Sequence, residues 1–231
     1  YDRQAKGVIL SSIDEDHSLV KEYIDKGMNF VLLDQRIENI NCPRINFDSN
    51  KGAAIAVQYL ISQGHRNIAF ATTPLTRWTR RETFKGYKQA LADAKITYTE
   101  RLLYVSNRVL DNGETNYEIN SGDYLANQFI ENRHDATAVL CINDMVAFGF
   151  IRTLIQNGIR VPEDVSVIGF DDIPFAEVFM PSLTTIRYPS NETGKLAAMM
   201  LYNNMESEDD TLNVEMNLEP HLIIRDTVGL F

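Results

Sequence analysis

The segment VPEDVSVIGFDDIPFAEVFMPSLTTI, residues 161–186, decides the fold class of this chain. Within it the apolar run VSVIGF (165–170) is typical of a buried strand, and two carboxylates, Asp171 and Asp172, follow it directly. In an open parallel sheet, ligands bind outside the carboxyl ends of the strands, so an acid in this position is placed to meet a solute. The segment therefore predicts a binding-site edge at Asp171.

The rest of the chain alternates short apolar runs with helical periodicity, which is the pattern of βαβ units around a parallel sheet. Helices are expected between the strands, including 144–157, which ends before Gly158, and roughly 191–206. We therefore expect an α/β fold made of doubly wound parallel sheets. The expected strands are 7–10, 30–34, 44–47, 67–72, 102–105, 136–142, 165–170 and 221–225.

Composition restricts the class of protein. With 231 residues, 44% hydrophobic and 23% charged, the chain is expected to be a soluble globular protein of one or two domains. Its net charge of -10 has the wrong sign for neutralising phosphates, so this chain alone is not expected to hold DNA. No apolar run approaches the roughly 20 residues of a membrane span, and we expect no membrane partner.

The two cysteines and the first residue carry further expectations. Cys42 and Cys141 lie beside or in expected strands and form no CxxC pair, which favours a reduced, cytoplasmic protein. The chain begins at Tyr1 rather than at a methionine. We expect it to be part of something longer.

Motifs of catalysis are missing from the sequence. It has no GxSxG, GxxxxGK[ST], HExxH or GxGxxG pattern, so we expect no enzyme and no cofactor. The histidines have no metal-ligand spacing, and His65, within QGHRNI, is interpreted as a structural turn residue. Asp171 and Asp172 are adjacent on one strand end, so their side chains point in different directions and do not form an acid pair that shares a proton.

The chain closely resembles the LacI/GalR family of transcriptional regulators. The resemblance covers nearly the whole chain, in matching order and spacing, and implies the effector-binding core of the family. That core has two doubly wound α/β subdomains of the periplasmic binding protein-like I type, linked by three crossovers, with a small effector clamped between them. The segments that carry it are INFDSNKGAAIAVQYLISQGHRNIAF (45–70), RRETFKGYKQAL (80–91), AVLCINDMVAFGFIRTLIQNGIRVPEDVSVIGFDD (138–172), PSLTTI (181–186) and LEPHLIIR (218–225).

The resemblance also implies a division into subdomains. Residues 1–67 with 190–217 are expected to form the N-terminal subdomain, and residues 68–189 with 218–231 the C-terminal one. The family places a helix-turn-helix domain, and then a strand, a helix and a second strand, ahead of the point where this chain starts. We therefore expect operator DNA to be bound through a helix-turn-helix that this chain does not contain.

Several residues are candidates for contacting the effector. The Asp171 carboxylate can accept hydrogen bonds from neighbouring sugar hydroxyls, with a turn or helix cap as the alternative. The Asn143 amide offers a donor and an acceptor together, which suits a polyol. Asn143 or Asp144, more readily Asp144, is alternatively the cap of the next helix. Tyr117 lies five residues before Gly122, where the family often carries an aromatic ring that stacks on the ligand, with a core aromatic as the alternative. The set of candidates is completed by Ser11, Asp48 and Tyr188.

The loop PLTRWTRR (74–81) and the residues after it depart from the pattern of the family. Three residues before Gly86, where the family commonly carries a ligand-binding arginine, this chain has Thr83. Either Arg81 reaches the cleft instead, or the arginine clamp of sugar-responsive members is not used. Trp78 is a lid over the ligand or a partly exposed anchor. The basic, threonine-rich loop also suits a phosphorylated or carboxylated effector.

Two functions remain in view. The first is a sensor domain of a transcriptional repressor or other regulator, in which a sugar-like effector closes the subdomains and changes operator binding across a homodimer. The second is a solute-binding protein of a sugar ABC transporter, since the folds are closely alike. Five apolar residues favour the dimeric regulator because they occupy places where family members dimerise: Met145, Phe148, Val178, Phe179 and Met180.

Overall fold

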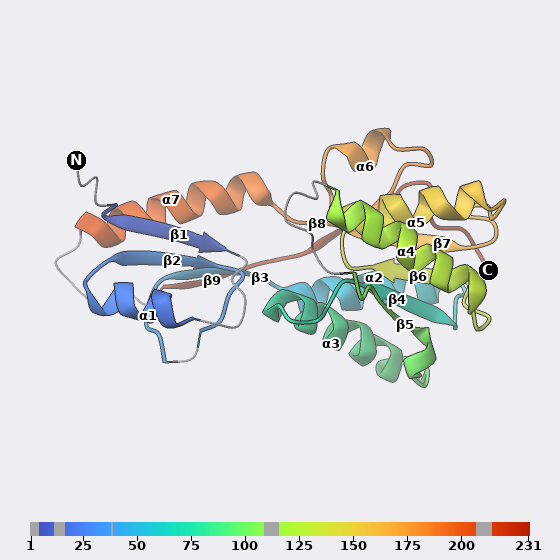
Figure 1. Cartoon of the computed structure of the whole chain (residues 1–231), viewed down its shortest axis with the longest axis horizontal. Helices are drawn as coiled ribbons and strands as arrows, with labels where there is room; N and C mark the ends of the chain where they lie inside the picture. The colour runs from blue at the N-terminus through green and yellow to red at the C-terminus, as the bar shows by residue number, and fades with distance from the viewer. Residues whose placement is uncertain (1–4, 12–16, 38, 109–115, 207–213) are drawn as a thin grey trace. The chain divides into compact units, whose positions relative to one another are not determined.

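The computed structural model describes residues 5–11, 17–37, 39–108, 116–206 and 214–231. The chain divides into two compact units, each built around its own sheet (Figure 1). The expected α/β fold with parallel sheets is confirmed. Unit 1 comprises Tyr1–Asp48, Thr76–Thr79 and Pro189–Glu219, and unit 2 comprises Ser49–Leu75, Arg80–Tyr188 and Pro220–Phe231.

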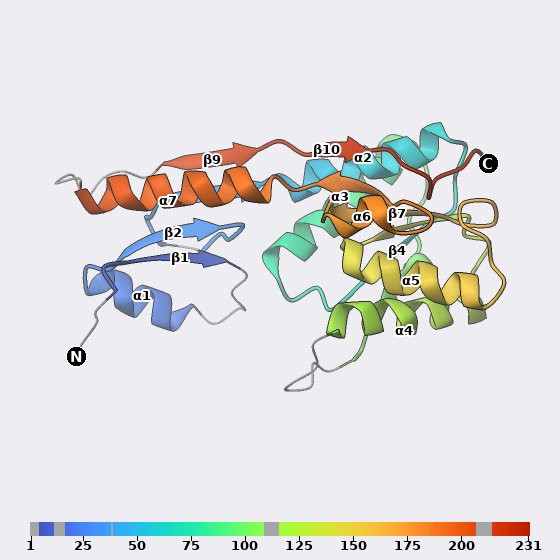
Figure 2. The same ribbon diagram turned by 90° about the horizontal axis from the view of Figure 1, so that it is seen from above.

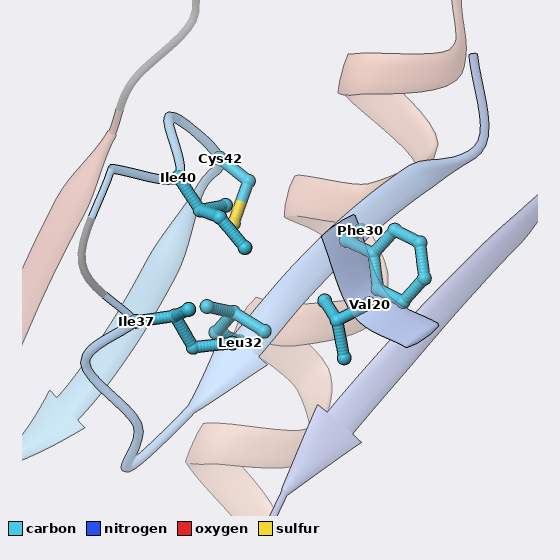
Figure 3. Close-up of a cluster of buried hydrophobic side chains, with 6 residues drawn as sticks. All are labelled: Val20, Phe30, Leu32, Ile37, Ile40 and Cys42. Atoms are coloured by element: carbon cyan, nitrogen blue, oxygen red, sulfur yellow. The ribbon is translucent and has the colours of Figure 1, made fainter. Parts of the chain in front are cut away.

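Unit 1 is a parallel sheet with a helix on each face. Alternate residues of its second strand point to opposite faces: Phe30 and Leu32 pack with Val20 of α1 (Ser18–Asp25), whereas Val31 packs with Ala197 of α7 (Ser190–Glu206). Figure 3 shows the first of these clusters, which includes Cys42. The strand order is β1 (Gly7–Ser11), β2 (Asn29–Leu33), β3 (Arg44–Phe47) and β9 (Glu215–Leu218).

Unit 2 contains the larger sheet. All neighbouring strands run parallel except β10, which pairs antiparallel with β8. Near-continuous apolar runs fit this arrangement, because a parallel sheet covered by helices buries both of its faces. The strand order is β10 (His221–Ile223), β8 (Thr184–Arg187), β7 (Ser166–Asp171), β6 (Ala138–Cys141), β4 (Ile68–Thr72) and β5 (Leu103–Val105).

Helices cover both faces of the unit 2 sheet. Phe170 of β7 packs against Gly52 of α2 (Ser49–Ser62), whereas the preceding residue, Gly169, faces the first residue of α5 (Asp144–Gln156). Consecutive strand residues point to opposite faces, so α2 and α5 lie on opposite sides. Helix α3 (Trp78–Asp93) packs beside α2, and α4 (Tyr117–Glu131) lies along α5 (Figure 2).

Helix α2 belongs to unit 2, although the sequence drew the boundary at residue 67. Its small residues explain the difference, because they let the helix approach unit 2 closely. A β-carbon at Gly52 would lie 2.8 Å from the Phe170 ring. One at Gly86 of α3 would lie 2.0 Å from the Asn50 carbonyl oxygen. Helix α2 therefore packs closely against both the unit 2 sheet and α3.

Strand β9, the four-residue helix α6 (Phe175–Val178) and the 3-10 turn Glu100–Leu102 were not anticipated. Cys42 and Cys141 are both free and buried. In the described ranges no helix combines the length and the apolar character needed to cross a bilayer.

His65 is a buried turn residue that fastens the end of the chain. Its ring contacts the hydroxyls of Thr137 at 2.8 Å and Ser166 at 3.0 Å, and it stacks on Phe231 with ring centroids 5.4 Å apart. The Phe231 amide donates to the Gln63 carbonyl at 2.9 Å. Burial lowers the pKa of His65 from its ordinary value of 6.5, although a hydrogen bond with the Gly229 carbonyl opposes this shift. The neutral imidazole is therefore part of the fold.

We predict that His65 makes a contribution to stability that is lost as pH drops below about 6.5 and that His65→Gln removes this part of the pH dependence. Because the folded-state pKa of His65 is depressed, its contribution is complete above the ordinary value and is lost as pH falls toward the folded value. Urea unfolding between pH 5 and 7.5 measures the effect. A pH dependence left unchanged in His65→Gln would contradict the assignment.

Candidate functional site

Three candidate residues follow neighbouring parallel strands at one edge of the unit 2 sheet. Asn143 follows β6, Asp171 ends β7, and Tyr188 follows β8. The Tyr188 amide donates to the Asp171 carbonyl at 3.0 Å. All three side chains are half-buried, which leaves part of each accessible. The edge has the location where open α/β sheets bind ligands.

Asn143 has a structural role at this edge. Its side-chain oxygen accepts from the Val146 amide at 2.9 Å, which makes Asn143 the N-cap of α5. Its amide nitrogen donates to the Glu118 carboxylate at 2.7 Å. The capping alternative weighed for Asn143 or Asp144 therefore applies to Asn143, whose amide is fixed in orientation at the edge of the sheet.

Arg80, rather than Arg81, joins this network. The Arg80 guanidinium pairs with Glu118 at 3.4 Å and donates to the Pro74 carbonyl at 3.3 Å, and its side chain is 13% exposed. Arg81 is exposed. The chain Arg80–Glu118–Asn143 therefore links three helix ends, those of α3, α4 and α5. Glu118 was not among the residues predicted from the sequence. A usable signal for it was an acid in the first turn of the helix that begins at Tyr117.

The aromatic candidates lie at helix starts. Tyr117 is the first residue of α4, and its hydroxyl donates to the Arg108 carbonyl at 3.0 Å. Trp78 is the first residue of α3 and is half-buried. Neither side chain is a core residue, because both keep exposed surface. Stacking on a ligand therefore remains a proposal for both.

The strand end at Asp171 has a strained backbone. Asp171 has a φ of 120° and Asp172 a φ of 55°, both in the region that favours glycine. Strain of this kind costs on the order of 1–3 kcal/mol per residue and persists only where the surroundings fix it. Asp172 supplies part of this constraint, because its carboxylate pairs with Arg187 and Arg225, each at 2.7 Å. The Asp172 carboxylate is therefore held by two arginines within unit 2.

Asp144 lies below the same edge and is fully buried. Its carboxylate accepts from the Ile173 amide at 2.9 Å and from the Thr185 hydroxyl. Burial raises its pKa to about 7, with a further rise from the Asp172 charge, while the two hydrogen bonds and Arg225 act in the opposite direction. A carboxyl group with this pKa is partly ionised at neutral pH.

In unit 1, Ser11 and Asp48 lie at the corresponding edge of the other sheet. Ser11 ends β1 and Asp48 follows β3, and both are exposed. Between them, at the end of β2, the Asp34 carboxylate accepts from the Phe47 amide at 2.6 Å. Each unit therefore carries polar candidates at the carboxyl edge of its own sheet.

The two threonines that precede the loop 74–81 are not accessible to a ligand. Thr72 and Thr73 are fully buried, the first donating to the Thr73 carbonyl at 2.7 Å. Elsewhere in the described ranges, no three His, Cys, Asp or Glu side chains gather closely enough to hold a metal ion. The groups that the unit 2 edge offers to a ligand are carboxylate oxygens, an amide and aromatic hydroxyls, which bind hydroxyl or N–H groups by hydrogen bonds.

We predict that Asn143→Ala lowers the free energy of unfolding by about 1 kcal/mol, because the substitution removes an N-cap from α5. Urea denaturation of the purified chain measures the change. Asn127→Ala is the matched control, since Asn127 only donates to the Asp123 carbonyl on an exposed helix surface and should change stability by less than about 0.5 kcal/mol. Equal effects of the two substitutions would contradict the capping role.

Comparison with known proteins gives a consistent family. Residues 57–228 match the periplasmic binding protein-like domain. The HTH-type transcriptional repressor PurR of Vibrio atlanticus (strain LGP32) is 34% identical over 229 residues, which are 98% of this chain and 65% of that protein. The chain thus spans slightly less than two thirds of the length of this curated relative.

Solved structures agree. A complex of the transcriptional regulator CelR with cellobiose has a TM-score of 0.87 at 28% identity, covering 98% of this chain and 67% of the other. A LacI family transcriptional regulator from Enterococcus faecium with bound ribose has a TM-score of 0.85 at 26% identity, covering 98% and 80%. The chain therefore belongs to the periplasmic binding protein-like domain family, as an effector-binding core of the kind found in LacI/GalR transcriptional regulators.

Proposed function

We propose that this chain is the effector-sensing and dimerisation part of a cytoplasmic DNA-binding transcriptional regulator. In this proposal a sugar or sugar derivative binds at the carboxyl edge of the unit 2 sheet and changes operator affinity. The observation that carries it is the edge of the unit 2 sheet, where Asn143 and Asp171 present fixed polar groups. A binding edge without an assembled reacting group fits a sensor better than an enzyme.

The chemistry of the edge favours a neutral ligand rich in hydroxyls. The Asp171 carboxylate is a hydrogen-bond acceptor on a strained backbone, and the Asn143 amide is held in one orientation by its bond with the Val146 amide. Glu118 already pairs with Arg80, so this cation does not offer an unopposed charge to a phosphate. An anionic group would also meet the carboxylate of Asp171. A sugar hydroxyl instead donates to a charged acceptor, which is among the stronger hydrogen bonds in proteins.

The proposal includes a mechanism for the sensor. An effector that binds one arrangement of the units more tightly than another shifts the equilibrium toward that arrangement, and Ser11 and Asp48 of unit 1 are proposed as further contacts. The effector shifts the equilibrium only by the difference between its affinities for the two arrangements. Trp78, Tyr117, Arg81 and Tyr188 are proposed as further contacts around the same ligand.

A homodimer is part of the proposal, and an apolar surface on unit 2 supports it. Three side chains around α6 are exposed: Phe175 at 53%, Val178 at 68% and Met180 at 82%. We call these residues the α6 patch. Apolar patches on soluble proteins commonly mark interfaces. A transport protein that works as a monomer has no need of such a surface, so the α6 patch favours a regulator over a solute-binding protein.

The contribution of α5 to this interface is smaller than the sequence suggested. Phe148 is buried within unit 2, where its ring packs against Phe175 and Phe179 at centroid distances of 5.1 and 4.7 Å. Met145 and Phe179 are half-buried. The apolar excess of α5 is used against α4 and α6, so the proposed dimer surface rests on the α6 patch.

DNA binding is assigned to a helix-turn-helix segment outside this chain. The net charge of -10 disfavours contact with phosphates. The curated relatives are described as HTH-type repressors, and this chain corresponds to 65% of the length of the Vibrio atlanticus protein. In the proposed division of labour the head contacts bases, while this core sets the spacing of two heads.

We predict that a sugar in a thermal-shift screen stabilises the wild-type chain and that Asp171→Ala weakens its binding by roughly 2 kcal/mol, about 30-fold, because a charged acceptor is lost. The screen covers D-ribose, cellobiose, sugar phosphates and purines. A ligand at 100 times its dissociation constant should stabilise the fold by about 2.7 kcal/mol. Asp123→Asn, on the α4–α5 surface, is the control and should bind normally. Binding that Asp171→Ala leaves intact would refute the site.

We also predict that fusion to the helix-turn-helix head of a relative with a known operator produces a dimer that retards the operator duplex, whereas this chain alone does not. Val178→Asp with Met180→Asp in the fusion should shift sedimentation toward the monomer and weaken operator binding at least tenfold, because two half-sites require two heads. Met199→Asp, similarly exposed on unit 1, should have no effect. Salt-resistant retardation by the unfused chain would overturn the sensor assignment.

A further inference from the structure

Asp144 ties the strained strand end of unit 2 to the helix behind it. It is the first residue of α5, yet one carboxylate oxygen accepts from the Ile173 amide at 2.9 Å, two residues beyond Asp171. The other oxygen accepts from the hydroxyl of Thr185 on β8. One buried side chain therefore connects α5, β8 and the turn after β7.

The Asp144 carboxylate occupies space that is open because Gly169 has no side chain. A β-carbon at Gly169 would lie 2.3 Å from an Asp144 carboxylate oxygen. Gly169 pairs with Thr185 in the register of β7 and β8, so the carboxylate lies directly over the strand pair that leads to Asp171. Any larger residue at Gly169 would displace the Asp144 carboxylate.

The turn needs such a connection. Asp171 and Asp172 both have positive φ angles, and each side of the turn is fixed. On one side the Tyr188 amide binds the Asp171 carbonyl, and on the other the Asp144 carboxylate binds the Ile173 amide. The Asp172 side chain is held by Arg187 and Arg225. Of these groups, Asp144 alone combines full burial with a hydrogen bond to the turn backbone.

We infer that Asp144 is a positioning residue: its ionised carboxylate holds the Ile173 amide and thereby keeps Asp171 in the conformation that meets the effector. Protonation of Asp144 weakens this hold. A charged acceptor forms hydrogen bonds roughly twice as strong as a neutral one, and the protonated group must also donate to Thr185. The link to effector binding rests on the proposed function, whereas the conformational effect does not.

The charged and titratable groups around Asp144 determine its response to pH. Asp172, on the turn after β7, disfavours the ionised form, and Arg225, beyond β10, favours it. Cys141 on β6 is buried, which raises the pKa of its thiol, and the Asp144 charge raises it further. The hydrogen bonds from Thr185 and Ile173 lower the pKa of Asp144, but burial outweighs them and the pKa is about 7. The hold of Asp144 on the Ile173 amide therefore changes near neutral pH.

The first experiment needs no ligand. In ¹H–¹⁵N NMR spectra of the whole chain, the Ile173 and Asp171 amides should titrate together with a midpoint near pH 7. Asp144→Asn should abolish this titration, and Thr185→Val should raise the midpoint, because a hydrogen bond to the ionised form is lost. Asp123→Asn should leave the midpoint unchanged. An Asp171 amide that does not titrate, or that titrates equally in Asp144→Asn, overturns the inference.

The second experiment measures binding of D-ribose and cellobiose by calorimetry at pH 6 and pH 8. If the ionised form is the competent one, the dissociation constant should be up to about tenfold weaker at pH 6, in proportion to its population, and flat with pH in Asp144→Asn. Binding that is equal at both pH values in the wild type overturns the positioning role. If neither sugar binds, the sugar assignment fails, while the NMR titration still decides the conformational claim.

Discussion

Direct backbone contact between paired helices determines the layers of unit 2. At Gly122 of α4 a β-carbon would lie 2.2 Å from the Val146 carbonyl oxygen, and at Gly149 of α5 one would lie 2.0 Å from the Ile119 carbonyl oxygen. Gly86 plays the same part between α3 and α2. Helices α4 and α5 touch at Gly122 and Gly149, and the Asn143 side chain at the N-terminus of α5 bonds Glu118 in the first turn of α4. Arg80 in the first turn of α3 pairs with the same carboxylate.

The sequence predicted those features that depend on local pattern. The buried run before Asp171 gave both the strand and the edge, because a strand buried on both faces has few polar residues until it ends. Strand β9 was not predicted, because its sequence EMNL alternates polar and apolar residues over only four positions. It also pairs with β3, which is distant in the chain. No local signal marks such a pairing.

Within the site, the sequence did not distinguish the roles of adjacent residues. Arg80 and Arg81 are neighbours on α3, and successive helical residues point about 100° apart, so only tertiary packing decides which one reaches Glu118. Asn143 and Asp144 present the same problem at a strand–helix junction, where one residue caps the helix and the other is buried.

Two buried groups have opposite effects on how stability depends on pH. The neutral His65 favours folding above its ordinary pKa, whereas ionising Asp144 costs stability as pH rises toward 7.

The position of β9 in the chain has a consequence for folding. Asn46 and Glu215, which bond across the β3–β9 pair, are 169 residues apart. Strands β4 to β8 of unit 2, by contrast, follow one another within the intervening segment. During synthesis unit 2 can therefore assemble most of its sheet before β9 has been made. Until then, the edge of β3 that pairs with β9 has no partner strand. Because pairings between distant residues form slowly, unit 1 would be the last part to become resistant to proteases, and its open sheet edge would be the most exposed to aggregation until then.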